Sequence, residues 1–320
     1  MKRFIVLLFC FALLLTACSS EQESTPTKVI KYVTATPAPT NTPMPTPTEE
    51  PHGPRIAFSS NRGADPNVLD VCVMDVNTGE ITVLNTGFNA AHFPKWSPDG
   101  SRIMFVVEQI WNLYTIKPDG SELTQLTDFR SNNADWSPDG SQIVFQSDHQ
   151  NEPVDTPDLY IMDLASGALT EILDQPEIID YSPRWSPDGE TIMFLSQLTG
   201  KYEIYTMNTD GSDMQQVSDT VDTVFDATWS PDGSRIAVVY GKGNLTDIYV
   251  MDPDGISNVV RLTANKSSNN NPSFTPDGQQ LLFSSNMNGN LDLYIINVDG
   301  SNLIQLTDDE YYDAYPDWSP

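Results

Sequence analysis

The sequence has few cysteines, few basic residues and few histidines, and each shortage argues against a class of protein. Three cysteines in 320 residues are too few for a disulfide-stabilised scaffold. Sixteen lysines and arginines stand against 44 acidic residues, a net charge of −28, so the basic face that binds nucleic-acid phosphates is missing. Only His92 and His149 lie beyond residue 52, which is few for a transition-metal site.

The sequence also lacks an apolar run long enough to span a bilayer. Its N-terminal run, Phe4–Leu15, would form a helix of only about 18 Å, against about 30 Å of bilayer hydrocarbon. Because Lys2 and Arg3 precede it, this run is typical of a signal peptide. It ends in Leu15-Thr16-Ala17-Cys18, which resembles the bacterial lipoprotein cleavage box. The alternative is an ordinary signal peptide with an incidental cysteine.

We therefore predict a lipoprotein signal peptide over residues 1–17 and a lipidated Cys18. The protein is then exported and held on the cell envelope membrane by its lipid anchor alone, facing the periplasm or the exterior. Residues 18–52 are rich in Pro and Thr, as in Pro43-Met44-Pro45-Thr46-Pro47. Repeated proline favours extended polyproline conformations, so we expect a disordered, semi-stiff stalk that reaches on the order of 100 Å.

Beyond residue 52 one motif recurs. Trp-Ser-Pro-Asp-Gly occurs at 96–100, 136–140, 185–189 and 229–233, Phe-Thr-Pro-Asp-Gly at 274–278, and Trp-Ser-Pro at 318–320. The aromatic residues that open these segments, here called the motif aromatics, are 40 to 49 residues apart. A period near about 45 residues is that of a four-stranded propeller blade.

Each repeat carries the signals of four β-strands. The segment Ser-Pro-Asp-Gly is typical of a tight turn, because proline presets φ, aspartate hydrogen-bonds locally and glycine accepts a positive φ. An apolar strand follows, then a strand such as 159–162, an Asp-Gly or Ser-Gly turn, and a short fourth strand. In the first repeat Cys72 replaces the tyrosine of the third strand, which predicts a buried packing role for this cysteine.

The two ends of the repeat region are complementary. Residues 54–60 read as a second strand without a first, and residues 314–319 as a first strand without a second. Joined, they complete one blade, and a ring closed in this way protects its sheet edges. We therefore predict an all-β fold over residues 53–320, a six-bladed β-propeller whose C-terminal strand completes the N-terminal blade. The alternative is an open, truncated array.

These motifs resemble those of a known family. The Trp-Ser-Pro-Asp-Gly segments and the Leu-Tyr-x-Met-Asp strands, as at 159–163, resemble the TolB-like, WD-repeat-like β-propeller family. The resemblance covers residues 53–320 and implies the same propeller fold. It further implies that TolB-type proteins carry an α/β domain before the propeller, whereas this chain has the predicted lipid anchor and stalk in that place.

The longer and more varied loops are predicted to share one rim of the propeller. They are the loops that enter an innermost strand or join the second and third strands: 61–65, 147–158, 175–181, 219–226 and 308–313. Variable loops on a rigid scaffold usually carry binding residues, so we expect the binding surface here. The alternative is that these loops vary because nothing constrains them.

The residues that directly precede the motif aromatics form a charged series around the predicted axis. In blade order they are Asp317, Lys95, Asp135, Arg184, Thr228 and Ser273. Alternating charges on four adjacent blades predict inter-blade ion pairs that fix the blade order. The same groups can orient a zwitterionic ligand, so Lys95, Asp135, Arg184 and Asp317 are also candidate partner-binding residues.

Two tyrosines complete the candidate binding residues. Tyr311 and Tyr312 lie in the acidic segment 308–313, which combines aromatic area with charge as protein-contact surfaces do. The alternative is a solvated loop. The Asp-rich loops make calcium a candidate cofactor, but none follows the twelve-residue calcium-loop pattern, which favours turn chemistry. No other cofactor is predicted.

The catalytic motifs of several enzyme classes are missing, so the sequence favours a protein that is not an enzyme. It contains no Gly-x-Ser-x-Gly elbow, phosphate loop or dinucleotide fingerprint. The leading hypothesis is a monomeric, membrane-anchored propeller that binds an envelope or extracellular protein, and the net charge favours a basic partner. One alternative is a glycan or small ligand at the tunnel mouth, helped by Tyr181, Phe225, Tyr311 and Tyr312. Another is a propeller lyase or hydrolase that depends on His92 or His149.

Overall fold

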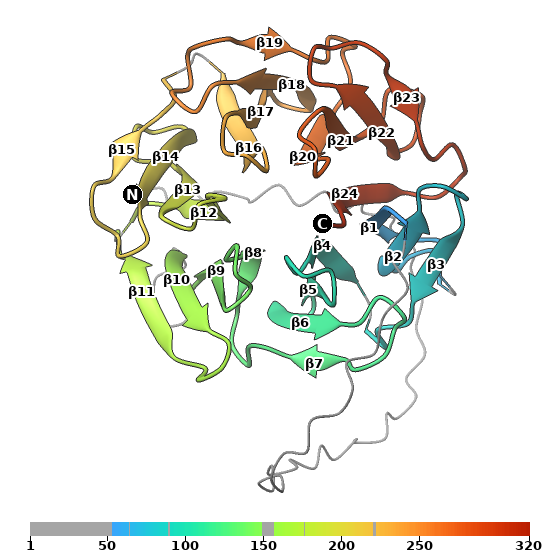
Figure 1. The fold of residues 1–320 in the computed structure, drawn as a ribbon, viewed down its shortest axis with the longest axis horizontal. Helices are drawn as coiled ribbons and strands as arrows, with labels where there is room; N and C mark the ends of the chain where they lie inside the picture. The colour runs from blue at the N-terminus through green and yellow to red at the C-terminus, as the bar shows by residue number, and fades with distance from the viewer. Residues whose placement is uncertain (1–52, 64, 89, 149–156, 176, 220–221) are drawn as a thin grey trace, which may run out of the picture. The chain divides into compact units, whose positions relative to one another are not determined.

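The strands of the chain form six separate sheets arranged in a ring (Figure 1). The computed structural model describes residues 53–320 except 64, 89, 149–156, 176 and 220–221. The predicted signal peptide 1–17, Cys18, the stalk 18–52 and His149 therefore lie outside the described residues. Each sheet has four strands, and the described residues include no helix. The predicted all-β, six-bladed propeller is confirmed.

The first three blades, each given from its inner to its outer strand, follow the ring in chain order. Blade 1 contains β24 (Asp313–Trp318), β1 (Arg55–Ser60), β2 (Asp70–Asp75) and β3 (Ile81–Leu84). Blade 2 contains β4 (Ala91–Trp96), β5 (Ile103–Val107), β6 (Asn112–Ile116) and β7 (Thr124–Gln125). Blade 3 contains β8 (Asn132–Trp136), β9 (Gln142–Ser147), β10 (Asp158–Asp163) and β11 (Leu169–Leu173).

The other three blades repeat this order. Blade 4 contains β12 (Asp180–Trp185), β13 (Thr191–Ser196), β14 (Glu203–Asn208) and β15 (Gln215–Gln216). Blade 5 contains β16 (Thr223–Trp229), β17 (Ile236–Lys242), β18 (Leu245–Met251) and β19 (Val260–Arg261). Blade 6 contains β20 (Asn269–Phe274), β21 (Gln280–Ser285), β22 (Asp292–Asn297) and β23 (Ile304–Gln305). Four of the six outer strands are only two residues long, so the edge that each exposes is short.

The ring closes between the two ends of the repeat region, as the sequence predicts. β24 pairs antiparallel with β1, and the register places Trp318 opposite Ile56 and Asp313 opposite Ser60. Figure 1 shows the two strands side by side, β24 in red and β1 in blue. Blade 1 is thereby built from both ends of the described chain, so unfolding it requires breaking long-range contacts.

The core lies between blades rather than inside them. Each of six apolar clusters combines buried side chains from two neighbouring blades. The cluster between blades 6 and 1 joins Ile56 and Phe58 to Leu282 and Leu293, and it contains Cys72. The predicted packing role of Cys72 is confirmed, and burial raises the pKa of its thiol to about 12.

The Ser-Pro-Asp-Gly segments form tight turns held by the aspartate. In blade 2, Oδ1 of Asp99 accepts hydrogen bonds from the Ser97 hydroxyl at 2.6 Å and the Ser101 backbone N–H at 3.0 Å. Gly100 has φ +68°, which a side chain would strain. These turns and the Asp-Gly or Ser-Gly turns define what we call the turn rim, and the longer loops define the loop rim.

Candidate functional site

The six residues that precede the motif aromatics meet around one cavity. Lys95, Asp135, Arg184, Thr228, Ser273 and Asp317 all line a chamber of about 230 Å³ on the side of the motif aromatics. Trp96, Trp136, Trp185, Trp229, Phe274 and Trp318 line the same chamber. The blades therefore bring together a polar ring and an aromatic ring at the centre of the propeller.

A predicted inter-blade ion pair forms between blades 1 and 2. Lys95 Nζ lies 2.9 Å from Oδ1 of Asp317, and both side chains are mostly buried. The second carboxylate oxygen of Asp317 accepts the Trp96 backbone N–H at 2.8 Å. Asp317 thus binds both a charge and a backbone donor of the next blade, which fixes the order of blades 1 and 2.

The predicted series of ion pairs between Asp317, Lys95, Asp135 and Arg184 is wrong at Arg184. This residue pairs with Asp226, which is not part of the series. Arg184 Nη2 lies 3.3 Å from Asp226 Oδ1, and the guanidinium also donates to the Pro183 carbonyl at 3.0 Å. Asp135 instead accepts the Trp185 backbone N–H at 2.9 Å, the contact that Asp317 makes with Trp96. Burial raises the pKa of Asp135, although the positive charges of Arg184 and Lys95 oppose this rise.

The mouth of the tunnel on the loop rim is lined by Lys95 and Arg184 and otherwise by residues that the sequence analysis did not select. The inner strand of every blade has a β-bulge a few residues before its motif aromatic. In five blades the third residue before that aromatic has φ between +48° and +55°: Phe93, Asn133, Ser182, Asn271 and Tyr315. In blade 5 this position is Asp226. Bulges redirect side chains, and non-glycine residues with positive φ cluster at functional sites.

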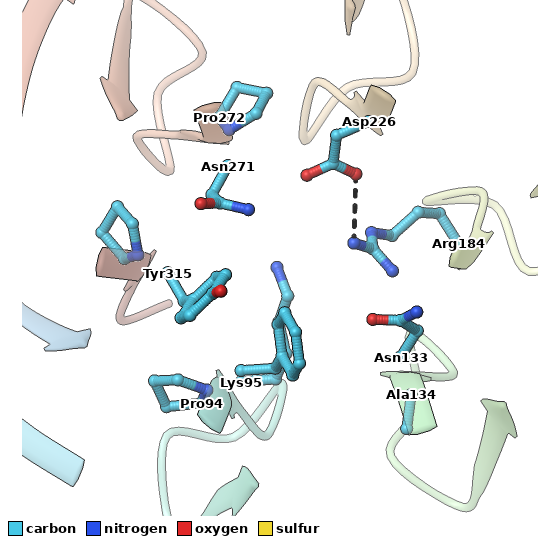
Figure 2. A pocket seen from close by; sticks show the side chains of 11 residues that line it. Pro94, Lys95, Asn133, Ala134, Arg184, Asp226, Asn271, Pro272 and Tyr315 are labelled. Atoms are coloured by element: carbon cyan, nitrogen blue, oxygen red, sulfur yellow. Dashed lines mark hydrogen bonds and ion pairs between the residues drawn. The ribbon is translucent and has the colours of Figure 1, made fainter. Parts of the chain in front are cut away.

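This mouth is narrow. Figure 2 shows Asn133, Asp226, Asn271 and Tyr315 around one centre, together with the Lys95 ammonium and the Arg184 guanidinium. The Phe93 and Tyr315 rings, 4.3 Å apart, close one side of the opening. The cavity that these residues line has a volume of about 30 Å³, so the mouth is far smaller than a site of about 300 Å³ for a small organic ligand.

His92, the described candidate for catalysis, is bound within its own blade. Its Nε2 lies 3.0 Å from Glu108 Oε2, and its ring packs edge-on against Tyr315. Burial lowers the pKa of His92, although Glu108 opposes this change. The described residues therefore place His92 beside the mouth with Glu108 as its polar partner.

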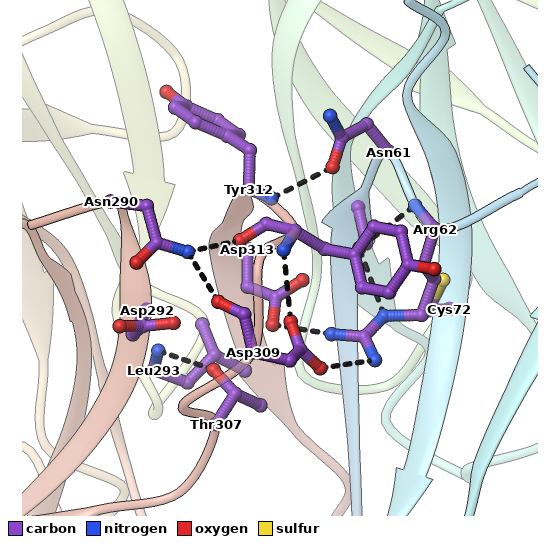
Figure 3. A network of polar contacts seen from close by, with 12 residues as sticks. Asn61, Arg62, Cys72, Asn290, Asp292, Leu293, Thr307, Asp309, Tyr312 and Asp313 are labelled. Carbon is purple, nitrogen blue, oxygen red and sulfur yellow. Dashed lines mark hydrogen bonds and ion pairs between the residues drawn. The ribbon is translucent and has the colours of Figure 1, made fainter. Parts of the chain in front are cut away.

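Neither Tyr311 nor Tyr312 lines the central cavities. Tyr312 lies at the seam between blades 6 and 1 (Figure 3), and Tyr311 directly precedes it. Arg62 forms ion pairs with Asp309 at 3.0 Å and with Asp313 at 2.5 Å, and its guanidinium lies 5.2 Å from the Tyr311 ring centre. These contacts join the loop after β1 to the loop before β24. They support the prediction that both kinds of loop share one rim.

The same network orders the segment that contains both tyrosines. Asn290 Nδ2 donates to the carbonyls of Asp309 at 2.8 Å and Tyr311 at 2.6 Å. The Tyr312 backbone N–H donates to Asn61 Oδ1 at 2.7 Å, while the Tyr312 side chain remains 37% exposed. The segment is therefore held by polar contacts and presents Tyr312 to solvent.

Apolar side chains on the loop rim extend this exposed surface. Ile110, Leu198, Phe225, Leu245 and Tyr312, one from each of five loop-rim segments, are exposed. The Tyr181 hydroxyl donates to the Phe225 carbonyl at 3.4 Å and so joins the rims of blades 4 and 5. Loops on a rigid scaffold often carry binding residues, so this set is a candidate contact surface.

The turn aspartates act through local hydrogen bonds. Besides Asp99, the aspartates of the other Pro-Asp-Gly turns, Asp139, Asp188, Asp232 and Asp277, accept hydrogen bonds within their own turns. These bonds lower the pKa of each carboxyl group. Within the described part of the chain, no group of three or more His, Cys, Asp or Glu side chains is placed to hold a metal ion. No described helix is long and apolar enough to cross a membrane.

The geometry defines the class of protein as a six-bladed β-propeller with a polar central tunnel. A family model described as the TolB beta propeller domain matches residues 34–154 and 216–320. The chain belongs to this family. Among solved structures, TolB from Acinetobacter baumannii has a TM-score of 0.71 at 23% identity and matches 83% of this chain and 66% of that one. An oligogalacturonate lyase in complex with manganese has a TM-score of 0.56 at 19% identity, over 78% of this chain and 73% of that one, which shows the fold alone.

The curated relatives differ in what their names say. An uncharacterized protein of Agrobacterium fabrum is 30% identical over 71% of this chain and 61% of its own length. The Tol-Pal system protein TolB of Bordetella pertussis is 34% identical over 50% of this chain and 36% of its length. The uncharacterized peptidase YuxL of Bacillus subtilis is 29% identical over 61% of this chain and 29% of its length. The chain thus spans less than two thirds of each of these relatives.

Proposed function

We propose that this chain is a non-catalytic propeller that binds an envelope or extracellular protein through its loop rim. The observation that carries this proposal is the exposed apolar set of the rim, Ile110, Leu198, Phe225, Leu245 and Tyr312, around a mouth too narrow for a small organic ligand. A relative named as a Tol-Pal system protein supports an envelope role. The match to the named peptidase covers only 29% of that protein, and the sequence of this chain contains no Gly-x-Ser-x-Gly elbow.

We further propose that residues 1–17 are a lipoprotein signal peptide, that Cys18 is lipidated, and that residues 18–52 are a stalk for the propeller of 53–320. The motives are the short apolar run, the cleavage-box resemblance and the Pro-Thr composition. Labelling of the expressed chain with a radioactive fatty acid tests the anchor. The label is expected on the wild type and not on Cys18→Ser, and a label that persists on Cys18→Ser would refute lipidation at this position.

Site-specific photocrosslinking in cells tests the proposed surface. A crosslinking amino acid at Phe225 or Tyr312 is expected to yield one adduct of defined mass, because both side chains lie exposed on the loop rim. The matched control is Ile256, which is 77% exposed in an Asp-Gly turn on the opposite rim and is expected to yield no such adduct. Equal adducts at all three positions, or none at any, would count against a protein partner on the loop rim.

The salt dependence of the adduct and the binding of oligosaccharides distinguish a basic protein partner from a glycan ligand. With a net charge of −28, the protein is expected to lose a basic partner as ionic strength rises, so an adduct that is indifferent to salt would remove the electrostatic part of the proposal. Saturable binding of a defined oligosaccharide, lost in Tyr312→Ala, would instead support the glycan hypothesis. Lys95, Asp135, Arg184 and Asp317 remain proposed partner-binding residues, tested in the same way.

A further inference from the structure

One dipeptide of the loop rim, Asn288-Gly289, has a side chain that its own backbone can attack. It lies in the loop between β21 and β22, and it is the only Asn-Gly step in the 320 residues. In such a step the backbone nitrogen of the glycine can reach the side-chain carbonyl carbon of the asparagine, because glycine has no side chain to hinder the approach. The sequence therefore places one asparagine for intramolecular attack.

The structure leaves room for this reaction. Asn288 and Gly289 are both exposed. Gly289 has φ +130°, a conformation that residues with a side chain rarely adopt, and nothing beyond its chain neighbours lies within 4 Å of the position that a Cβ would occupy. The described part of the chain therefore sets no steric obstacle to closing a ring between the two residues.

The nine Asp-Gly steps of the chain provide an internal comparison, because an aspartate can form the same ring. They are the steps at 99–100, 119–120, 139–140, 188–189, 210–211, 232–233, 254–255, 277–278 and 299–300. In each of them the glycine N–H donates to the carbonyl three residues earlier at 2.8–3.0 Å, and the Gly289 N–H donates to the Asn286 carbonyl at 3.1 Å. The attacking nitrogen is therefore held in a similar way in all ten steps.

The attacked carbon distinguishes Asn288 from the nine aspartates. Hydrogen bonds within the turns outweigh any effect of burial and lower the pKa of all nine carboxyl groups, so each is an anion at neutral pH. A carboxylate resists attack, because its negative charge makes the carbon a poor electrophile. The Asn288 side chain is a neutral amide that can release ammonia. The turns thus protect the Asp-Gly steps, and no such protection acts on Asn288.

The Asn288 amide also supports a buried acid. Its Nδ2 donates to Gln305 Oε1 at 2.7 Å, and Gln305 Nε2 donates to Asp292 Oδ2 at 3.0 Å. Asp292 is 1% exposed, and Figure 3 shows it next to Asp309 of the Arg62 network, whose charge it senses. Asn288 therefore holds Gln305 in the orientation that points its amide donor at Asp292.

We propose that Asn288 deamidates spontaneously in the folded protein and that the product weakens the seam between blades 6 and 1. The Gly289 nitrogen bonds to Asn288 Cγ, the bond from Cγ to the amide nitrogen breaks, and the Gly289 N–H proton leaves with that nitrogen as ammonia. Water then opens the resulting succinimide at either of its carbonyl groups, which gives aspartate or isoaspartate at position 288.

Both products carry a carboxylate, which accepts hydrogen bonds and donates none. Gln305 Oε1 then faces a negative charge, so Gln305 turns its amide donor toward position 288 and Asp292 loses it. A buried carboxylate that loses its donor lowers the stability of the fold. Deamidation therefore adds a negative charge to the loop rim and weakens ring closure, independently of which partner the rim binds.

Peptide mass spectrometry of the aged full-length chain in detergent tests the modification. Conversion at Asn288 is measured from the mass gained when NH₂ is replaced by OH, and isoaspartate from its methylation by an isoaspartyl methyltransferase. We expect conversion at Asn288 to be about tenfold faster than at any Asp-Gly step, a barrier about 1.4 kcal/mol lower. The same chain aged in urea is the reference, in which the Asp-Gly steps lose their turns and are expected to react faster than in the folded chain.

One substitution and a matched control test the consequence. Asn288→Asp reproduces one product and is expected to lower the Tm by about 3 °C, as ageing does in the wild type. Asn302→Asp places the same charge at an exposed position of the same blade and is expected to leave the Tm unchanged. The Tm of the aged wild type decides the matter if Asn288→Asp does not fold.

Three results would overturn the proposal. The first is an Asn288 amide that persists in the folded chain while the chain in urea loses it. The second is conversion of folded Asp-Gly steps as fast as that of Asn288, which would mean that the turns give no protection. The third is an unchanged Tm in both Asn288→Asp and the aged wild type, which would show that Asp292 does not depend on the Asn288 amide.

Discussion

At the scale of single residues, the contribution of an ion pair to the free energy of unfolding depends on how deeply the pair is buried. Lys95→Met removes the cation beside Asp317, which would stay mostly buried and bound to the Trp96 N–H. We expect the free energy of unfolding to fall by about 1–3 kcal/mol, measured by urea denaturation. The control Lys117→Met breaks an exposed pair with Glu122 and should cost less than about 0.5 kcal/mol. Unchanged stability with lost partner binding in Lys95→Met would assign Lys95 to recognition instead.

The spacing of the repeats predicted an ion pair only where both partners occupy the same repeat position on neighbouring blades. Lys95 and Asp317 occupy the same position of adjacent repeats, so their pairing could be predicted. Arg184 turns to Asp226, which lies two positions earlier in its own repeat and reaches the tunnel through a bulge. The periodic pattern identifies the strands but does not reveal where a strand gains a residue, so this partner could not be predicted.

At the scale of the element, the positive φ of the inner-strand bulges restricts which residues they accept. Ser182 has φ +55° and is buried. Ser182→Val should lower the free energy of unfolding by about 1–3 kcal/mol, because a β-branched residue is strained in this conformation, whereas Ser182→Gly should be near neutral. Urea denaturation of both variants tests this. Equal losses would show that the serine side chain, and not the backbone, determines the cost.

The closing strand is held by one arginine whose removal should be costly. Arg62→Met leaves Asp313 buried without its cation, so we expect the free energy of unfolding to fall by about 3–5 kcal/mol. The exposed Arg130, paired with Asp148, is the control, and Arg130→Met should change stability by less than about 1 kcal/mol. A small effect of Arg62→Met in calorimetry would mean that backbone pairing of β24 with β1 alone closes the ring.

Elements were predictable from this sequence to different degrees. The repeated turn motif and the complementary ends fixed the number of blades and their closure, because both depend on local turn chemistry and chain order. The Arg62 network depends on a loop that follows β1 and another that precedes β24, about 250 residues later. Ring closure predicts that the two loops share a rim, but no repeat unit contains both, so only the structure reveals the Arg62 contacts between them.

At the scale of the whole molecule, acidic residues lie on both rims of the described propeller. Eleven turn aspartates on the turn rim have a lowered pKa, because each accepts hydrogen bonds within its turn. They are Asp75, Asp99, Asp119, Asp139, Asp163, Asp188, Asp210, Asp232, Asp254, Asp277 and Asp299. A basic partner is therefore attracted to both rims, and the crosslinks at Phe225, Tyr312 and Ile256 decide which rim it contacts.

Two buried carboxyl groups, those of Asp180 and Asp292, predict that the free energy of unfolding rises when the pH falls below neutral. Burial raises the pKa of Asp180 and Asp292 to about 6, above the ordinary 3.8, so the folded state binds these protons more tightly than the unfolded state. The free energy of unfolding should therefore rise as the pH falls from 7 toward 4, and the shrinking negative charge acts in the same direction. His92 opposes this rise, because its lowered pKa favours the unfolded state below its ordinary value of 6.5.

Below this range the turn aspartates reverse the trend. Hydrogen bonds lower the pKa of Asp139 and Asp232 to about 2, so their stabilisation is complete above the ordinary 3.8 and is lost as the pH falls toward 2. Stability should therefore be greatest at about pH 4–5, measured as the urea midpoint from pH 2 to 8 with chelator present. The double variant Asp180→Asn, Asp292→Asn should lose most of the rise between pH 7 and 4. A wild-type maximum at neutral pH would show that these two carboxyl groups do not bind their protons in the folded state.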